Sequence, residues 1–258
     1  MKKILTSALL ASFLLGTSAS ADFTRIEMGA GLWQQNSSGV STYTDSTTGA
    51  TGTDTVIDDT MNKAYLWVLI KHPIPIVPNL KLEYTSVEYN GVVTGSLEDF
   101  IVPDGYTSNS HLTMDEYDII PYYNLLDNTF WVTLDIGLDI RILDADYEAG
   151  AINVGGINVF DGYTDSSTVV IPLGYLRARV EIPTTNIGLE GDIRYITYDG
   201  SSIIDARAKI DYTFDVFPVI EPGIEIGYRY QNYDLDDNEG TKSDLTFDGF
   251  YAGVNLKF

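Results

Sequence analysis

The sequence predicts an all-β protein: a transmembrane, antiparallel, up-and-down β-barrel of about ten strands (8–12), with short periplasmic turns and long extracellular loops. Three observations predict it. The N-terminus reads as an export signal, the remainder divides into long segments that alternate apolar and polar residues, and the connections between these segments alternate in length.

The first 21 residues have the three parts of a secretory signal peptide. Met1 to Lys3 is basic, residues 4–16 are mostly apolar, and Ala19-Ser20-Ala21 fits a cleavage site. The apolar part is too short to span a membrane, for which a helix needs about 20 apolar residues. We therefore expect a signal peptide at 1–21 and one barrel domain at 22–258.

Composition narrows the class of protein. The chain has 37 acidic and 15 basic residues, a net charge of −22, so nucleic acid is excluded as a partner. It has no cysteine, which excludes disulfides and thiolate metal sites. After residue 21 the longest apolar run is Tyr65–Ile70, so any membrane crossing must be made by strands.

The period-2 segments are long enough to cross a bilayer when tilted. In residues 130–142 the even positions are all apolar, whereas the odd positions carry Trp131, Asp135, Asp139 and Arg141. The expected strands are 22–34, 62–72, 79–90, 112–124, 129–143, 169–182, 187–198, 202–214, 222–233 and 245–258.

The connections supply the third observation. Short turns are expected at 73–79, 125–128, 183–186 and 215–222, and the connections after the first, third and fifth strands are long and polar. The Ser/Thr/Gly-rich stretch 36–55 is interpreted as a mobile loop.

Aromatic residues gather near the segment ends, which is typical of membrane-interface girdles. The expected girdles are Tyr122, Tyr123, Phe130, Phe214 and Phe258 at the short-turn side, and Tyr89, Tyr195, Tyr228, Tyr230 and Phe250 at the long-loop side.

Basic residues fall on the polar face of the predicted strands beside acidic ones, which favours a closed polar lumen. The candidate network is Arg141, Arg177, Arg179, Arg194, Arg207, Arg229, Asp135, Asp139, Glu190 and Asp192. It either stabilises a plugged barrel or sets the selectivity of a narrow pathway for small solutes. Glycines on the same face would leave room for such a pathway: Gly29, Gly31, Gly137, Gly227, Gly249 and Gly253. A wide porin is excluded, because that needs roughly 16–18 strands.

The last eight residues, Tyr251-Ala-Gly-Val-Asn-Leu-Lys-Phe258, resemble the C-terminal assembly signal of Gram-negative outer-membrane proteins. The matching positions are Tyr251, Gly253, Leu256 and Phe258. This resemblance implies an outer-membrane location and recognition by the barrel-assembly machinery. In length and layout the chain is similar to a proteobacterial outer-membrane family named for a Gly-Gly motif, and Gly155-Gly156 is its only Gly-Gly.

Catalytic and metal-binding patterns are weak. His72 and His111 lack an Asp-x-His motif, and no G-x-S-x-G occurs, so we expect no catalytic residues, no cofactor and no enzyme activity. Asp234, Asp236 and Asn238 partly resemble a calcium loop, but Gly240 comes one residue late and Leu245 replaces the expected Glu. We expect an acidic hydrated loop without a metal; loose divalent-ion binding that bridges to lipopolysaccharide phosphates is a hypothesis.

Two functions remain open for a monomeric outer-membrane barrel that contacts membrane lipid and lipopolysaccharide. The first is a narrow channel for small solutes. The second is a structural or surface-interaction, adhesin-like barrel that acts through acidic loops 35–61, 91–111 and 144–168.

Overall fold

The computed structural model describes residues 25–57, 59–74, 76–217, 219–237 and 240–258. The predicted signal peptide lies outside these residues. No helix in the described part of the chain is long and apolar enough to span a membrane.

The strands match the alternating segments of the sequence, and most extend further. They are β1 (Arg25–Thr44), β2 (Thr51–Val56), β3 (Asp59–Lys71), β4 (Asn79–Leu97), β5 (Phe100–Ile101), β6 (Ser108–Thr129), β7 (Val132–Ala149), β8 (Ile152–Val154), β9 (Ile157–Phe160), β10 (Tyr163–Glu181), β11 (Ile187–Tyr198), β12 (Ser201–Thr213), β13 (Glu221–Asp236) and β14 (Thr241–Lys257).

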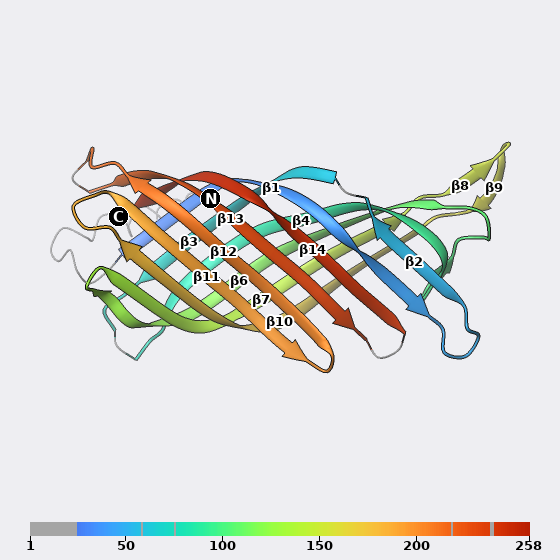
Figure 1. Cartoon of the computed structure of the whole chain (residues 1–258), viewed down its shortest axis with the longest axis horizontal. Coiled ribbons are helices and arrows are strands. Elements are labelled where there is room, and N and C mark those ends of the chain that lie inside the picture. The colour runs from blue at the N-terminus through green and yellow to red at the C-terminus, as the bar shows by residue number, and fades with distance from the viewer. Residues whose placement is uncertain (1–24, 58, 75, 218, 238–239) are drawn as a thin grey trace, which may run out of the picture.

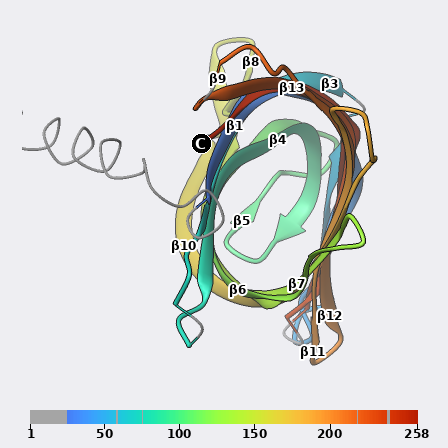
Figure 2. The same cartoon turned by 90° about the vertical axis from the view of Figure 1, so that its left-hand side faces the viewer.

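Ten strands close into an antiparallel barrel (Figures 1 and 2), which confirms the predicted fold class: β1, β3, β4, β6, β7, β10, β11, β12, β13 and β14. Each of the ten pairs with its neighbours in chain order, and β14 pairs back onto β1 from Glu27↔Lys257 to Tyr43↔Thr241. At the seam the Phe258 N–H donates to Ile26 O at 2.9 Å. Because the barrel is closed, each of its strands is paired on both sides over at least part of its length.

The barrel has two unlike ends. We call the end with the four short turns and the chain's last residue the turn end, and the opposite one the loop end. At the loop end, β1, β4, β6, β7 and β10 run well past β11 and β12 (Figure 1).

The mobile-loop interpretation of 36–55 is wrong. β1 continues to Thr44, β2 begins at Thr51, and only the turn between them is without strand. The extra length is held by long ladders, because β1 pairs with β14 on one side and with β2 on the other as far as Tyr43. The short turn expected at 125–128 is also displaced, since β6 runs to Thr129 and Phe130-Trp131 make the turn.

The hydrogen-bond ladder of the barrel is interrupted where β4 passes from β3 to β2. β3 pairs with β4 as far as Tyr65↔Thr85, and β2 resumes the pairing at Val56↔Gly91. Val56 and Tyr65 are nine residues apart in the chain, whereas their partners on β4, Gly91 and Thr85, are only six residues apart. Among the described residues, the contacts across the gap include the Gln35 amide, which donates to Ser86 O at 2.6 Å, and the Ile57 N–H, which donates to Asn90 O at 2.8 Å. The Asn90 amide also donates to Asp59 at 3.3 Å, and Lys63 pairs with Glu88.

The outer surface changes from apolar to polar between adjacent rows of cross-strand neighbours. One row joins Tyr84, Tyr117, Ile142 and Val170, and the two tyrosine rings pack at 5.2 Å. The next row toward the loop end joins Ser86, Asp115, Asp144 and Thr168. Aromatic residues favour the membrane–water interface, so this step marks the edge of the apolar band.

The expected girdles are confirmed only in part. Tyr195, Tyr228, Tyr230 and Phe250 are exposed near this edge, whereas Tyr89 and Tyr122 are only 2% exposed. The latter two point into the lumen, because each lies on the inward parity of its strand, with Val87 and Ile120 as equally buried neighbours two residues away.

Candidate functional site

The lumen charges form a continuous network, whose centre is Asp205 on β12. Its Oδ2 accepts from Arg141 at 2.7 Å, from Arg194 at 2.9 Å and from Arg229 at 2.7 Å. These three guanidinium groups come from β7, β11 and β13, so one carboxylate ties together strands from different sides of the barrel. Asp205, Arg141 and Arg194 are completely buried.

Arg141 and Arg229 extend this centre toward the loop end and toward β6. Arg141 is bidentate on Asp118, at 2.8 and 3.1 Å, and donates to the Tyr233 hydroxyl at 3.0 Å. Arg229 donates to Thr85 Oγ1 at 2.7 Å and to Glu116 at 3.3 Å. Planar guanidinium groups suit such multiple contacts, because their donors are held in a fixed fork.

Glu83 on β4 links the centre to a second group of charges. It pairs with Arg194, accepts from Arg207 at 2.8 Å and lies 2.7 Å from Lys81. Arg207 in turn is bidentate on Asp192. The three cationic partners of Glu83 offset the desolvation of this buried carboxylate.

A third group lies nearer the turn end. Arg177 bridges Asp135 and Glu190, at 2.6 Å each. Arg179 also contacts Glu190 and is bidentate on Asp211, with one bond of 2.9 Å. The shared Glu190 joins the two arginines into one chain of ion pairs.

Every residue of the predicted lumen network therefore faces the lumen, and the contacts bring them together. The network also includes Asp205, Glu83 and Glu116, which the sequence pattern alone does not single out. Facing follows from strand parity, but partners such as Arg194 and Glu83, 111 residues apart, depend on the register around the whole barrel. Lys63 lies on the inward parity of β3 and pairs with Glu88 at the ladder break.

Glu116, Asp118 and Asp205 are the described side chains that converge closely enough to resemble a metal site. The arginines already supply positive charge there, since Arg141 contacts all three. Asp139 differs from its neighbours, because neither of its carboxylate oxygens has a hydrogen-bond partner among the described residues, although Arg194 Nε lies 3.2 Å away.

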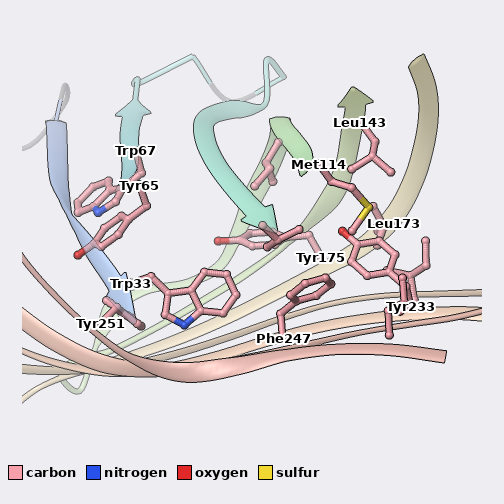
Figure 3. Close-up of a cluster of buried hydrophobic side chains, with 14 of the residues drawn as sticks. Trp33, Tyr65, Trp67, Met114, Leu143, Leu173, Tyr175, Tyr233, Phe247 and Tyr251 are labelled. Atoms are coloured by element: carbon pink, nitrogen blue, oxygen red, sulfur yellow. The ribbon is translucent and has the colours of Figure 1, made fainter. Parts of the chain in front are cut away.

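An apolar layer adjoins the charge network toward the loop end (Figure 3). Its members include Trp33, Met114, Leu143, Leu173 and Phe247, all buried. They come from five strands of the barrel. Going from the turn end toward the loop end, the lumen is thus filled by ion pairs and after them by a packed apolar cluster.

The lumen glycines do not leave a pathway, which corrects the role expected of them. An added Cβ on Gly29 would lie 2.5 Å from Trp67 Nε1, and one on Gly31 would lie 2.7 Å from Tyr65 Oη. Trp67 and Tyr65 both donate to Glu225, at 3.1 and 2.7 Å. The glycines therefore make room for inward aromatic rings. An added Cβ on Gly227, Gly249 or Gly253 would also lie within 4 Å of an aromatic side chain. One on Gly137 would meet the backbone and Cβ of Tyr122.

The space that remains in this part of the lumen is small. A cavity of about 20 Å³ lies between Trp67, Arg207 and Glu225. This is room for roughly one water molecule. In this conformation the side chains at the centre of the network are out of reach of solvent from either end.

Two clusters cover the loop end. The Asp54 carboxylate accepts from Ser110 at 2.6 Å, Tyr147 at 2.9 Å and Tyr89 at 3.0 Å. Beyond it, Phe100 of β5 stacks on Tyr163 with centroids 4.6 Å apart. Figure 2 looks along the barrel and shows β5 lying across the interior of the ring.

Tyr163 belongs to this cover and lies outside the apolar band. Desolvation, followed by its hydrogen bond to Asp99 at 3.0 Å, raises the pKa of Tyr163 to about 12. The neutral hydroxyl is favoured because the neighbouring carboxylate opposes a phenolate.

The two histidines have structural contacts. His72 Nε2 lies 3.0 Å from Pro78 O, and the Ile74 N–H donates to His72 Nδ1, which holds the turn after β3. His111 Nδ1 lies 3.0 Å from Asn90 Oδ1 on the outer surface.

Part of the predicted calcium-loop candidate lies in the described residues at the end of β13. Asp236 pairs with Lys242 at 2.8 Å, and Asp237 accepts from the N–H groups of Gly240 and Thr241. Asn238 lies outside the described residues. Gly155 and Gly156 make the β8–β9 turn, with φ of 58° and 84°, which non-glycine residues seldom adopt.

The residues of the resembled assembly signal alternate across β14. Tyr251 and Gly253 face the lumen, where the Tyr251 ring packs edge-on against Tyr65, and Leu256 lies on the opposite parity. Phe258 closes the seam with Ile26. Recognition by assembly machinery stays a prediction.

Comparisons with known proteins agree on the fold alone. No family model and no curated protein sequence matches the chain. Similar solved structures include the outer membrane protease OmpT of Escherichia coli, with 11% identity, 94% of this chain and 99% of that one covered, and a TM-score of 0.49. The translocator domain of the autotransporter NalP of Neisseria meningitidis has 11% identity, covers 100% of this chain and 96% of that one, and has a TM-score of 0.42.

These structures are outer-membrane β-barrels of Gram-negative bacteria. The barrel fold of this chain rests on its own closed strand pairing. The resemblance to the Gly-Gly family finds no support among them. The expectation of no enzyme activity was wrong as an exclusion, because a protease stands among the similar barrels. The missing motifs around His72 and His111 do not suffice to exclude enzyme activity.

Proposed function

We propose that this chain is a surface-interaction barrel of the outer membrane, whose closed lumen is a structural plug and whose working surface is the projecting wall at the loop end. We define this wall as the parts of β6, β7 and β10 beyond the row of Tyr117, Ile142 and Val170. With the turn end in the periplasm, the wall faces the outside of the cell.

The observation that carries the proposal is the burial of the central charges. Glu116, Arg141, Arg194 and Asp205 each have no exposed surface. A solute path needs polar groups that water can reach, and here they are satisfied by one another. The plug role thus accounts for the lumen charges, and the projecting wall is left to meet a partner.

The wall is acidic, which defines the chemistry of that partner. Asp144, Asp146 and Glu148 lie on its outer face, and their cross-strand neighbours include Asp115. Together with the net charge of −22, this favours a partner with a basic surface, drawn in by long-range attraction.

The first test is conductance in planar bilayers. The folded protein is expected to give no unitary current. A reproducible single-channel current would overturn the proposal and favour the narrow channel, with selectivity set by the lumen charges. Truncating Arg177 and Arg179 to alanine widens the lumen and serves as the positive comparison, provided that the variant stays heat-modifiable on gels.

The second test is binding of a folded basic protein, lysozyme, to vesicles that carry the barrel. Binding is expected, and about 0.5 M salt should abolish it, because such attraction is screened within a few ångströms. The Asp144→Asn/Asp146→Asn/Glu148→Gln variant should lose it. The control variant neutralises three acids of the turn end, Asp127→Asn/Asp215→Asn/Glu221→Gln, and should retain it. Equal binding by both variants would contradict the wall as the working surface.

A further inference from the structure

We infer that the free edge of β10 is a docking strand, which takes up an extended basic segment of a partner polypeptide by β-sheet addition. The inference rests on the proposed surface function and names the mode of binding. It starts from the unequal lengths of β10 and β11.

β10 has a partner on one side for its whole length and on the other side for less than half of it. It pairs with β7 from Tyr163↔Ala149 to Val180↔Val132 without interruption. It pairs with β11 only from Gly174↔Tyr195 onward. In the described part of the chain, residues 163–173 therefore form a sheet edge that no strand covers.

The direction of the backbone groups along this edge follows from two hydrogen bonds. The Glu181 N–H donates to Trp131 O on the β7 side, and the Ile182 N–H donates to Ile187 O on the β11 side, both at 2.9 Å. Backbone groups alternate sides along a strand. Even-numbered residues thus direct their N–H and C=O groups to the open side, and these are Thr164, Ser166, Thr168 and Val170.

Pro172 fits the same pattern. It is even-numbered, so the N–H that proline lacks would point to the open side. The hydrogen bonds between β10 and β7 are therefore all retained. The next even residue, Gly174, is the first to pair with β11. Open hydrogen-bonding positions therefore run from Thr164 to Val170, just before the barrel closes.

Most of the usual protection against strand addition is missing between Thr164 and Val170: Pro172 lies beyond this stretch, and Asp165, on the inward parity, is its one charged residue. Edges in native proteins carry lysines, prolines, bulges or inward charges. Residues 164–170, Thr-Asp-Ser-Ser-Thr-Val-Val, contain no proline, no basic residue and no bulge, and all seven are exposed. Val169 and Val170 are 48% and 61% exposed. Serine, threonine and valine in an extended, exposed row are well suited to pair with a new strand.

Charge decides which strand would dock. A groove of about 530 Å³ lies beside the edge on the outer surface, and its lining includes Asp146, Glu148, Asp165 and His111. Lysine or arginine side chains on the outer face of an added strand would extend over this groove. A second copy of the chain fits poorly, because two surfaces of a strongly acidic protein repel each other.

The test uses a labelled eight-residue peptide, Lys-Thr-Lys-Val-Lys-Thr-Lys-Val, and the folded barrel in detergent, with binding followed by fluorescence anisotropy. In an antiparallel pair the lysines that share the outer face with Ser166 also direct their N–H groups to β10. N-methylation of the lysine backbone nitrogens should therefore weaken binding at least ten-fold. A peptide N-methylated at Thr and Val is the matched control and should bind like the parent.

A reciprocal test changes the protein. Ser166→Pro/Thr168→Pro removes two N–H groups that point away from β7, and should also weaken the parent peptide at least ten-fold. Ser166→Ala/Thr168→Ala removes the same hydroxyls, keeps the N–H groups and should bind normally. Heat-modifiability on gels checks that both variants are folded.

The outcomes separate this inference from the proposed function. Equal binding of the two methylated peptides, with loss in the Asp144→Asn/Asp146→Asn/Glu148→Gln variant, would overturn strand addition and leave the acidic surface standing. Absence of both peptide and lysozyme binding would overturn both. Concentration-dependent dimerisation that Ser166→Pro/Thr168→Pro abolishes would identify a second copy as the occupant and overturn the basic partner.

Discussion

The lumen and the projecting wall treat polar groups in opposite ways. In the lumen, Asp205 receives three guanidinium groups and Glu83 contacts three cations, so nearly every charge is paired with charge. On the projecting wall, Asp144, Asp146 and Glu148 make no ion pair with another described residue, and the β10 edge leaves backbone groups open. A structural network saturates its members, whereas an interaction surface leaves them available.

The largest effect is expected from breaking the lumen network at its centre. Asp205→Ala should lower the free energy of unfolding by about 3–5 kcal/mol, because it leaves buried arginines uncompensated. Urea unfolding of the barrel in lipid vesicles measures this. The comparison variant is Asp146→Ala on the wall, which should change stability by less than about 0.5 kcal/mol. Equal effects would remove the distinction between the two regions.

A smaller effect is expected where glycine makes room for a ring. Gly29→Ala should cost about 1–3 kcal/mol, because the new methyl group overlaps Trp67. Gly191→Ala is the matched control, since its Cβ would be 3.5 Å from the nearest atom, Arg207 O, and should be nearly neutral. In a Trp67→Leu background the cost at Gly29 should shrink; an unchanged cost would contradict the packing explanation.

The smallest effect is expected at the loop-end cover. The pKa of Tyr163 is raised to about 12 from its ordinary value of 10.0, so its contribution to stability is complete below pH 10 and is lost as pH rises toward 12. The difference in absorbance titration at 295 nm between the wild type and Tyr163→Phe should show one tyrosine that ionises near pH 12. Asp99→Asn should lower that midpoint. Ionisation near pH 10 in the wild type would contradict the hydrogen bond to Asp99.

The sequence predicts the barrel well, because period 2 assigns each residue to a face whatever the final register. Arg177 and Arg179 were placed in the lumen on that basis alone. Their partners could not be predicted, because Asp135 and Asp211 reach them only through the pairings of β7 with β10 and of β11 with β12.

Two errors have a common physical cause. Tyr89 was assigned to the outer girdle and 36–55 to a mobile loop, since aromatic and Ser/Thr-rich stretches were judged by composition. In the structure, neighbouring strands continue beyond the apolar band and provide ladders that a Ser/Thr-rich segment can join. The β10 edge likewise has no sequence signal of its own, because it exists only where β11 ends.

The ladder break between β3 and β4 has a mechanical consequence. A closed barrel behaves like a hoop, and its resistance to widening is set by its weakest joint. At this break the described strands are joined by the Gln35 amide, one backbone bond from Ile57, the Asn90–Asp59 hydrogen bond and the Lys63–Glu88 pair. The barrel is therefore expected to widen most easily at this break between β3, β2 and β4, just outside the apolar band.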